Sequence, residues 1–448
     1  MEKNLTTGSV FKTIVYFSLP YLLSYFLQTL YGMADLFIIG QFKGVDSTTA
    51  VSIGSQIMHM ITVMIVGLAV GSTVIIGRLT GAGDKKQIST AIGNTVTLFI
   101  GISLILMAIL LTMVNPIVDI MSTPEEAIAE TIKYLKICFI GIPFITMYNV
   151  ISSILRGMGD SKRPMYFISI ACVANIVLDY IFISRLNLGA SGAALGTTIS
   201  QAFSVIISII VIMKGKDIKN LSLKIFKPRI HTIKELLKIG IPVSLQDGFI
   251  QISFIIITII VNRRGLNDAA AVGIVEKIIC ILFLVPSSMM STVSALVAQN
   301  IGANKHNRAK ATLKYALLIS AIFGTIVAIS VQFVSEPLVN LFVQDKDVVI
   351  LGGQYLRSYV WDCIFAGIHF SFSGYFYAYG LSIISFIHNS ISIIGVRIPF
   401  SYLASKHFAN TLFPMGLAAP AGSILSAIIC FVVFIRLNTK NNKTLKST

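Results

Sequence analysis

The chain is 448 residues long, with 55% hydrophobic residues, only 12% charged residues and a mean hydropathy of +0.84. A typical soluble domain carries roughly 25% charged residues, so this composition excludes a water-soluble globular protein. The formal net charge of +16 would suit a nucleic-acid partner if it formed one patch, but the Lys and Arg residues are spread over separate loops. We therefore expect a membrane protein with no nucleic-acid partner.

Twelve apolar blocks follow one another along the chain, each long enough for a membrane-spanning helix of about 20 residues. None shows the alternating pattern of a membrane β-barrel, so the sequence predicts an all-α integral membrane fold. The first block extends to Ile39 without a small-residue cleavage pattern, which indicates a membrane helix and not a cleaved signal. All five cysteines fall inside these blocks, which argues against a disulfide framework or a metal cluster. The predicted spans are 14–39, 49–77, 88–113, 130–153, 164–184, 191–213, 235–261, 269–298, 310–334, 353–378, 381–404 and 412–436.

Lys and Arg residues are concentrated in alternate loops between the predicted spans. This asymmetry marks the cytoplasmic side of a membrane protein. Both termini are therefore predicted to be cytoplasmic, in a multi-pass protein of the bacterial inner (plasma) membrane whose basic loops face anionic lipid head groups. The basic loops contain Arg78, Lys85 and Lys86; Arg156, Lys162 and Arg163; the run from Lys214 to Lys238; Lys305, Arg308 and Lys310; and Lys440, Lys443 and Lys446, whereas the loops between them contain few, such as Lys43, Arg185 and Lys346.

The second half of the chain resembles the first at a constant offset of 221 residues. The matched positions include Gly81-Ala82 with Gly302-Ala303, Tyr134-Leu135 with Tyr355-Leu356, and Gly159 with Gly380. Because each half holds an even number of helices, the two halves keep one orientation and are predicted to be parallel repeats. We predict an N-lobe at 1–213, a basic cytoplasmic linker at 214–234 and a C-lobe at 235–448, in a monomer. Two fused, unlike halves favour a transporter with alternating access over a channel, which is more often a ring of separate subunits.

The halves differ most in the polar residues of their predicted spans. Asp35 lies in the first span, and Asn175 and Asp179 lie one turn apart on one face of the fifth. Thr197 follows a run of small residues that opens the sixth span. The sequence therefore predicts an ion site in the first half that the second half lacks. The counterparts of these four residues are Ile256, Val396, Phe400 and, after a short insertion, Ile424.

Two chemistries fit this set of residues. Two carboxylates, an amide oxygen and a hydroxyl are hard oxygen ligands that suit Na⁺, whereas two acids in a poorly solvated setting can share a proton. An isolated carboxylate at membrane depth costs at least about 2.5 kcal/mol, which favours a functional role for Asp35 and Asp179. The alternative is structural: the acids cap backbone groups or pair with a fixed cation, and Asn175 and Thr197 make ordinary hydrogen bonds between helices.

Four motifs resemble those of multidrug and toxic compound extrusion (MATE) transporters, and the similarity covers nearly the whole chain. The resemblance implies export of organic cations and other amphipathic molecules, driven by inward Na⁺ or H⁺. It does not separate these exporters from related flippases of lipid-linked saccharide precursors, which share the two-lobed plan. The motifs are Tyr31-Gly-Met-Ala-Asp35 with Gly40, Leu155-Arg-Gly-Met-Gly-Asp160 with Pro164, Asn175-Ile-Val-Leu-Asp179, and Gln299-Asn-Ile-Gly-Ala303.

The DinF-like branch of the family is the better match. In that branch the ion site lies in the N-lobe, at the positions that Asp35, Asn175, Asp179 and Thr197 hold here, with a backbone carbonyl near Ala193 as a further ligand. Pro20 matches the proline at which the first helix is proposed to bend. The NorM-like branch carries a glutamate in the seventh helix, where this chain has Ile250.

The substrate is expected in a cavity between the lobes. No Gly-Lys-Ser/Thr follows the loop glycines Gly81 and Gly83, so no nucleotide is expected and export must use an ion gradient. The sequence contains no recognisable set of nucleophile and matching base, so we do not expect an enzyme. No cofactor is expected, and Na⁺ is the only metal ion implied. A flippase would need a cationic cavity, whereas the basic residues of this chain lie mainly in loops, and Lys277 and Arg397 are the exceptions that could supply one. The residues predicted to line the cavity are Gln28, Tyr31, Met33, Gln56, Asp247, Gln251 and Glu276.

Overall fold

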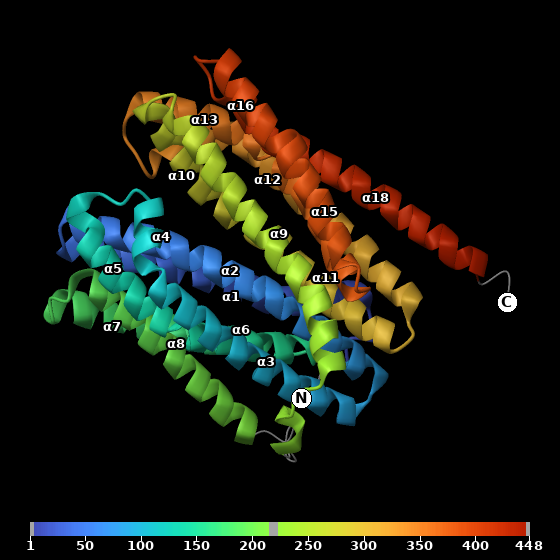
Figure 1. The fold of residues 1–448 in the computed structure, drawn as a ribbon. Coiled ribbons are helices and arrows are strands. Elements are labelled where there is room, and N and C mark those ends of the chain that lie inside the picture. Colours follow the sequence, from blue (N-terminus) through green and yellow to red (C-terminus); the bar gives the residue numbers. More distant parts are fainter. Residues whose placement is uncertain (1–3, 215–222, 445–448) are drawn as a thin grey trace. The chain divides into compact units, whose positions relative to one another are not determined.

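The computed structural model describes residues 4–214 and 223–444, and every regular element within those ranges is a helix (Figure 1). The predicted all-α fold is therefore confirmed, whereas the predicted linker at 214–234 lies partly outside the described residues. The elements are α1 (Val10–Phe42), α2 (Val45–Ala82), α3 (Lys85–Thr112), α4 (Val114–Ile120), α5 (Glu125–Ile140), α6 (Ile142–Gly157), α7 (Lys162–Asp179), the π-helical η1 (Tyr180–Arg185), α8 (Gly189–Lys214), the 3₁₀ helix η3 (Leu223–Phe226), α9 (Ile230–Asn262), α10 (Leu266–Leu282), α11 (Leu284–Gly302), α12 (His306–Asn340), α13 (Lys346–Tyr359), α14 (Asp362–Ala378), α15 (Ser382–Ser392), the π-helical η4 (Ile393–Arg397), α16 (Ile398–His407), α17 (Phe413–Gly416) and α18 (Ala418–Thr444).

The chain divides into two compact units. The first unit comprises residues 1–244 and 298–306, and the second comprises residues 245–297 and 307–448. The boundaries fall inside α9 and α11 and after the first residue of α12, so each of these helices contributes residues to both units. The lobe boundaries predicted at residues 213 and 235 stay a prediction.

Ten helical stretches among the described residues are long and apolar enough to cross a membrane, and the pair α5 and α6 makes an eleventh if it is counted as one span. The predicted span 130–153 is this pair, which bends by 46° at Gly141. Pro143 in the first turn of α6 has no backbone N–H to donate, which favours a break just before it. The predicted span 353–378 is likewise a pair, α13 and α14, of 14 and 17 residues.

The repeat seen in the sequence is also a repeat of local structure. The broken spans α5–α6 and α13–α14 occupy matching places in the two halves, and the span after each pair contains a π-helical segment. In the first half this segment, η1, ends the span, whereas in the second half η4 lies inside it. Left-handed backbone recurs as well, at Gly83 (φ 74°) and Asn304 (φ 57°) and at Gly159 (φ 88°) and Gly380 (φ 72°). These conformations follow the 221-residue offset, so the two halves end their helices in the same way.

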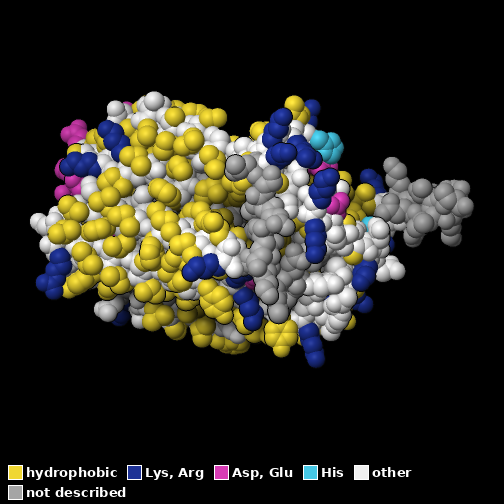
Figure 2. All heavy atoms as spheres, turned by 90° about the horizontal axis from the view of Figure 1, so that it is seen from below, with side chains coloured by type: hydrophobic (Ala, Val, Ile, Leu, Met, Phe, Trp, Pro, Cys, Tyr) yellow, Lys and Arg dark blue, Asp and Glu magenta, His cyan; other side chains and the backbone are white. Residues whose placement is uncertain are grey.

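The outer surface carries the apolar stripes that a lipid environment requires. Along α8 the exposed side chains recur every three or four residues, which is one face of a helix. Figure 2 shows hydrophobic side chains over most of the left part of one face, with Lys and Arg gathered further to the right. A soluble protein rarely exposes such broad apolar areas, so these faces are suited to lipid contact. The exposed stripe of α8 comprises Ile199, Phe203, Ile206, Ile210 and Met213.

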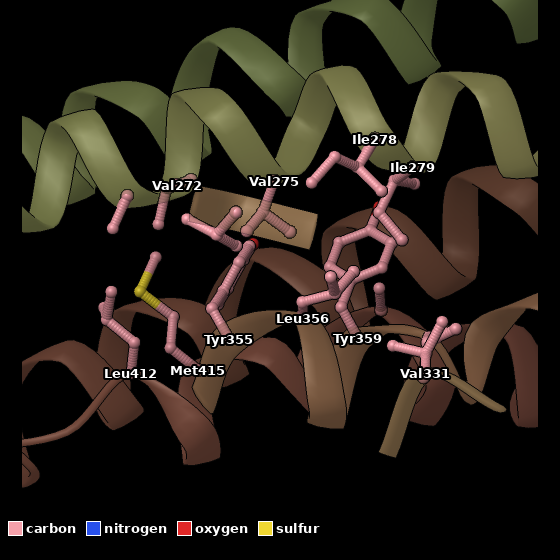
Figure 3. Close-up of a cluster of buried hydrophobic side chains, with 14 of the residues drawn as sticks. Val272, Val275, Ile278, Ile279, Val331, Tyr355, Leu356, Tyr359, Leu412 and Met415 are labelled. Carbon is pink, nitrogen blue, oxygen red and sulfur yellow. The ribbon is translucent and has the colours of Figure 1, made fainter. Parts of the chain in front are cut away.

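Each unit has its own buried core. In the second unit, Val275 and Ile279 of α10 pack against Tyr355 and Tyr359 of α13, as Figure 3 shows. The core of the first unit joins α1, α2, α5, α6 and α8. Because lipid tails are as apolar as these side chains, close packing rather than exclusion of water favours such contacts inside a membrane. The first-unit core includes Ile39, Ala50, Val51, Leu135, Phe139 and Ala193.

Candidate cation site in the first unit

Helices α1, α7 and α8 pack against one another in the first unit and bring four predicted site residues together. Asp35 lies in α1, Asn175 and Asp179 lie one turn apart in α7, and Thr197 lies in α8. All four side chains are buried, and Asn175 and Asp179 have no exposed area at all. Residues that are 162 positions apart in the sequence therefore meet in one place.

The hydrogen bonds of this group join the acids to neutral donors. Thr197 Oγ1 donates to Asp35 Oδ2 at 3.1 Å, and Asn175 Nδ2 donates to Asp179 Oδ2 at 3.2 Å. The Asp35 carboxyl group also lies within hydrogen-bonding reach of the side chains of Asp179 and Asn175. Two carboxyl groups from different helices therefore face each other in a buried setting, each with one neutral donor.

Three buried oxygens of the group have no hydrogen-bond partner among the described residues, namely Asp35 Oδ1, Asn175 Oδ1 and Asp179 Oδ1. Leaving a buried polar atom unsatisfied costs about 1–3 kcal/mol, and more for a charged group. Oxygen atoms are the ligands that hard cations prefer, and a proton between the two carboxyl groups would serve as a donor to both. The residues therefore fit either Na⁺ or H⁺.

Gly196 allows the Asp179 carboxylate to lie directly against α8. A methyl group built on Gly196 would come within 1.9 Å of Asp179 Oδ1, a distance that no real contact allows. The small-residue run Gly189–Gly196 marks the start of the predicted span that holds Thr197, but it does not indicate this role of Gly196.

Two more polar residues belong to the neighbourhood of the site. The Tyr31 hydroxyl contacts the side chains of Thr197 and Gln201. Gln201 is buried and lies one turn after Thr197 on the same face of α8, a spacing that could have identified it. Gln201 was not among the residues predicted from the sequence, and Tyr31 was predicted to line the substrate cavity and not to lie beside the ion site.

The two other residues predicted for the site, Ala193 and Pro20, lie on helices that carry its side chains. Ala193 is buried in α8, one turn before Thr197. Pro20 lies inside α1, which continues through it from Val10 to Phe42. Because proline has no backbone N–H, the helix lacks one of its hydrogen bonds there, which makes this turn easier to bend.

The residues predicted to line a substrate cavity are divided between the units. Tyr31 and Gln28 are partly buried and Met33 and Gln56 are exposed, all in the first unit. Asp247, Gln251 and Glu276 are partly buried in the second unit. That these seven residues line one cavity stays a prediction.

Two of the sequence motifs meet elsewhere in the first unit. Gln299 Nε2 donates to the carbonyl of Gly157 at 2.9 Å, so the Gln299–Ala303 motif contacts the Leu155–Asp160 motif. Gln299 Oε1 also accepts from the backbone N–H of Leu5 at 3.2 Å, and Lys305 Nζ donates to the Thr6 carbonyl at 2.9 Å. These bonds tie the N-terminal segment, α6 and the end of α11 together.

Helices α2 and α11 cross at a pair of glycines near these bonds. A methyl group on Gly81 would lie 1.9 Å from the Gln299 carbonyl oxygen, and one on Gly302 would lie 1.8 Å from that of Arg78. Only glycine allows two backbones to come this close. The glycines of the repeat therefore set how closely α2 and α11 pack.

The comparisons with known proteins agree with this architecture. The MatE family model matches residues 20–181 and again residues 242–403. The protein named "Probable multidrug resistance protein YpnP" of Bacillus subtilis is 30% identical over 415 residues, which is 92% of each chain. The "Multidrug export protein MepA" of Staphylococcus aureus is 28% identical over 373 residues, which is 83% of this chain and 82% of that protein.

Solved structures show the same fold. A crystal structure of MATE in complex with MaL6 matches with a TM-score of 0.91 at 23% identity over 99% of both chains. The outward-facing conformation of a multidrug resistance MATE family transporter of the MOP superfamily matches with a TM-score of 0.90 at 23% identity, over 99% of this chain and 98% of that chain. The two matched segments of the family model also confirm the two-half organisation. Together with the apolar helices, these matches show that the chain is a multi-pass membrane transporter, not an enzyme, and belongs to the MatE family of multidrug efflux transporters.

Proposed function

We propose that the chain is a secondary antiporter that exports organic cations or other amphipathic molecules across the bacterial inner membrane, in exchange for inward H⁺ or Na⁺. The observation that carries this proposal is the buried meeting of Asp35 and Asp179, whose Oδ1 atoms have no partner among the described residues. The substrate class follows the names of the relatives, which are multidrug export and resistance proteins. Those names also favour export of drugs over the flipping of lipid-linked saccharides.

The proposed coupling is electrostatic. With both acids ionised, two like charges face each other between α1 and α7, in a setting where water screens them poorly. A proton or Na⁺ removes that repulsion and strengthens the contact between the two helices. Ion binding therefore favours the packing in which α1 lies closer to α7. The weak turn at Pro20 allows α1 to bend between this packing and a looser one.

Alternating access follows if substrate binds better to the packing that the ion disfavours. Linkage then requires that each ligand weakens the binding of the other by the same factor. The ion gradient drives the cycle, with no cofactor and no nucleotide. Both termini and the basic loops are cytoplasmic in this proposal, and one chain is sufficient for transport.

The test is to replace each acid by its neutral amide, in Asp35→Asn and Asp179→Asn, and to measure efflux of a fluorescent organic cation from proteoliposomes. Na⁺ and pH gradients are imposed separately. We expect either change to abolish gradient-driven efflux while the protein stays folded and still binds the substrate. The matched controls, Ile256→Leu and Phe400→Leu, change the counterpart positions and should leave efflux close to that of the wild type.

The same variants identify the ion. If Na⁺ is the coupling ion, Na⁺ should raise the melting temperature of the wild type more than K⁺ does, and both amide variants should lose this response. If H⁺ is the coupling ion, ion binding should be seen as proton uptake that the amide variants lack. Strong gradient-driven efflux by the double amide variant would refute the proposed site.

A further inference from the structure

The second unit contains a charged group of its own, and the proposed coupling does not use it. It comprises Arg397 at the end of η4, Asp362 at the start of α14 and Glu276 in α10. By the repeat offset, Arg397 corresponds to Ile176, which is next to Asn175 of the candidate cation site. The two halves therefore place different charges on matching elements. We call these three residues, with Phe254, Tyr359 and Ser423, the second-unit cluster.

The guanidinium group of Arg397 lies among aromatic rings. Its central carbon is 4.5 Å from the centroid of the Phe254 ring and 5.9 Å from that of Tyr359. Arg397 Nη2 also donates to the Tyr359 hydroxyl at 2.8 Å. The negative face of an aromatic ring attracts a cation, so these rings form a favourable setting for any flat organic cation.

The acids of the cluster are near Arg397 but do not form ion pairs with it. No ion pair within 4.0 Å between described residues includes Arg397, Asp362 or Glu276. Asp362 is only 3% exposed, and its Oδ1 has no partner among the described residues, while its carboxyl group bonds Ser423. Arg397 Nε is likewise buried without a partner there. The cluster thus has two acids for one guanidinium, and the exposed Lys277 also lies near Glu276. Asp362 and Arg397 each have one buried polar atom without a partner among the described residues.

We propose that the second-unit cluster is a binding site for an organic cation, and that the Arg397 guanidinium occupies this site until such a ligand displaces it. Arginine suits this role because its head is a delocalised, planar cation on a long, flexible stem. Arg397, Phe254 and Glu276 are each only partly buried, so the described residues do not enclose the cluster completely. The ligand would stack on Phe254 and Tyr359, and Asp362 and Glu276 would neutralise its charge. The inference rests on the proposed function for its substrate class only.

A purely structural role for Arg397 predicts the opposite result from this proposal. If Arg397 only neutralises buried acids, its removal weakens the fold and adds no binding, because truncating one partner of a buried charged group leaves the other uncompensated. If Arg397 competes with a ligand, its removal strengthens ligand binding. A gain in affinity is a result that damage to the fold does not produce.

The experiment measures binding of ethidium, a planar organic cation, to the purified full-length protein in detergent, without any ion gradient. We expect Arg397→Ala to tighten binding by roughly tenfold, the scale of one or two cation–π contacts. Adding Asp362→Asn to Arg397→Ala should remove this gain. The matched control is Arg357→Ala, since Arg357 bonds Glu336 at 2.9 Å and Ser335 at 2.7 Å outside the cluster. This control should leave the affinity unchanged.

A second variant guards against misfolding of Arg397→Ala. Tyr359→Phe keeps the aromatic ring but removes the hydroxyl that holds Arg397, so it should also tighten binding, by a smaller factor. Equal or weaker binding by both variants would overturn the proposal. The same gain measured in a chain that carries Asp35→Asn and Asp179→Asn would show that this site is independent of the proposed coupling, so failure of one proposal is distinguishable from failure of the other.

Discussion

The Asp179 carboxylate can approach α8 only because residue 196 has no side chain. In the interior of a helix, changing glycine to alanine normally stabilises by about 0.5–1 kcal/mol, because alanine loses less conformational freedom on folding. At position 196 this gain is opposed by a clash with Asp179 Oδ1, since the added methyl group would lie 1.9 Å away. Which effect dominates is therefore a direct measure of how tightly the site is packed.

We predict that Gly196→Ala impairs transport more than it impairs folding. Overpacking costs about 1–3 kcal/mol, enough to lower ion occupancy by roughly tenfold, and the strain falls on Asp179, one of the two acids of the proposed site. Gradient-driven efflux and the melting temperature of the same preparation measure the two effects. The control is Gly101→Ala in α3, where an added methyl group meets nothing within 4 Å. Efflux by Gly196→Ala that equals that of this control would show that Asp179 does not need its present position.

Part of the site was predictable at the scale of residues. The four-residue spacing of Asn175 and Asp179 places both on one helix face, and comparison of the two halves selected Asp35 and Thr197 as unusual. That α1, α7 and α8 converge on these residues is a property of helix packing, which no local pattern contains. The role of Gly196 was hidden for a related reason, because a run of small residues indicates close packing without indicating what packs there.

At the scale of elements, the crossing of α2 and α11 depends on backbone contact. The carbonyl oxygens of Gln299 and Arg78 lie where side chains of residues 81 and 302 would be. A backbone atom cannot move aside as the end of a flexible side chain can, so any larger residue must separate the helices.

We predict that Gly302→Ala separates α2 from α11 and lowers stability by about 1–3 kcal/mol, the usual cost of overpacking. Thermal unfolding of the purified protein measures this change. A cysteine placed at Ala303 should also react faster with a thiol reagent in the Gly302→Ala variant. Unchanged unfolding and labelling, as expected for a control Gly273→Ala whose added methyl group meets nothing within 4 Å, would contradict the crossing described here.

Helix continuity was less predictable than helix existence. Hydropathy gave the long apolar blocks, but it does not distinguish one straight helix from two helices joined at an angle. Gly141 and Pro143 provide a physical reason for the break between α5 and α6. No proline lies between α13 and α14, and only the repeat relates this break to the first.

At the scale of the whole molecule, the distribution of Lys and Arg predicts the orientation in the membrane. Single cysteines that replace Lys85, Lys162 and Lys305 should be protected from a membrane-impermeant thiol reagent in intact cells and should react in inverted vesicles. Cysteines that replace Lys43 and Lys346 should behave in the opposite way. The physical reason is the retention of basic loops in the cytoplasm.

The background for this labelling is favourable. Four of the five native cysteines are buried, and Cys280 is the exposed one, so the chain with Cys280→Ser is the natural parent for all five variants. Reaction of Lys85→Cys and Lys305→Cys on opposite sides would contradict the parallel arrangement of the two halves, because these residues follow equivalent helices of the repeat.

The bonds from Leu5 and Thr6 to Gln299 and Lys305 have a practical consequence for anyone who attaches a reporter to this protein. A fluorescent domain or affinity tag joined directly before Leu5 would crowd the Leu5 and Thr6 backbone groups that bond Gln299 and Lys305 at the end of α11. The same reporter joined after Thr448 leaves those bonds untouched. Assays of transport rate should therefore use fusions at the carboxyl end, and a fusion at the amino end should be separated from Leu5 by a long flexible spacer.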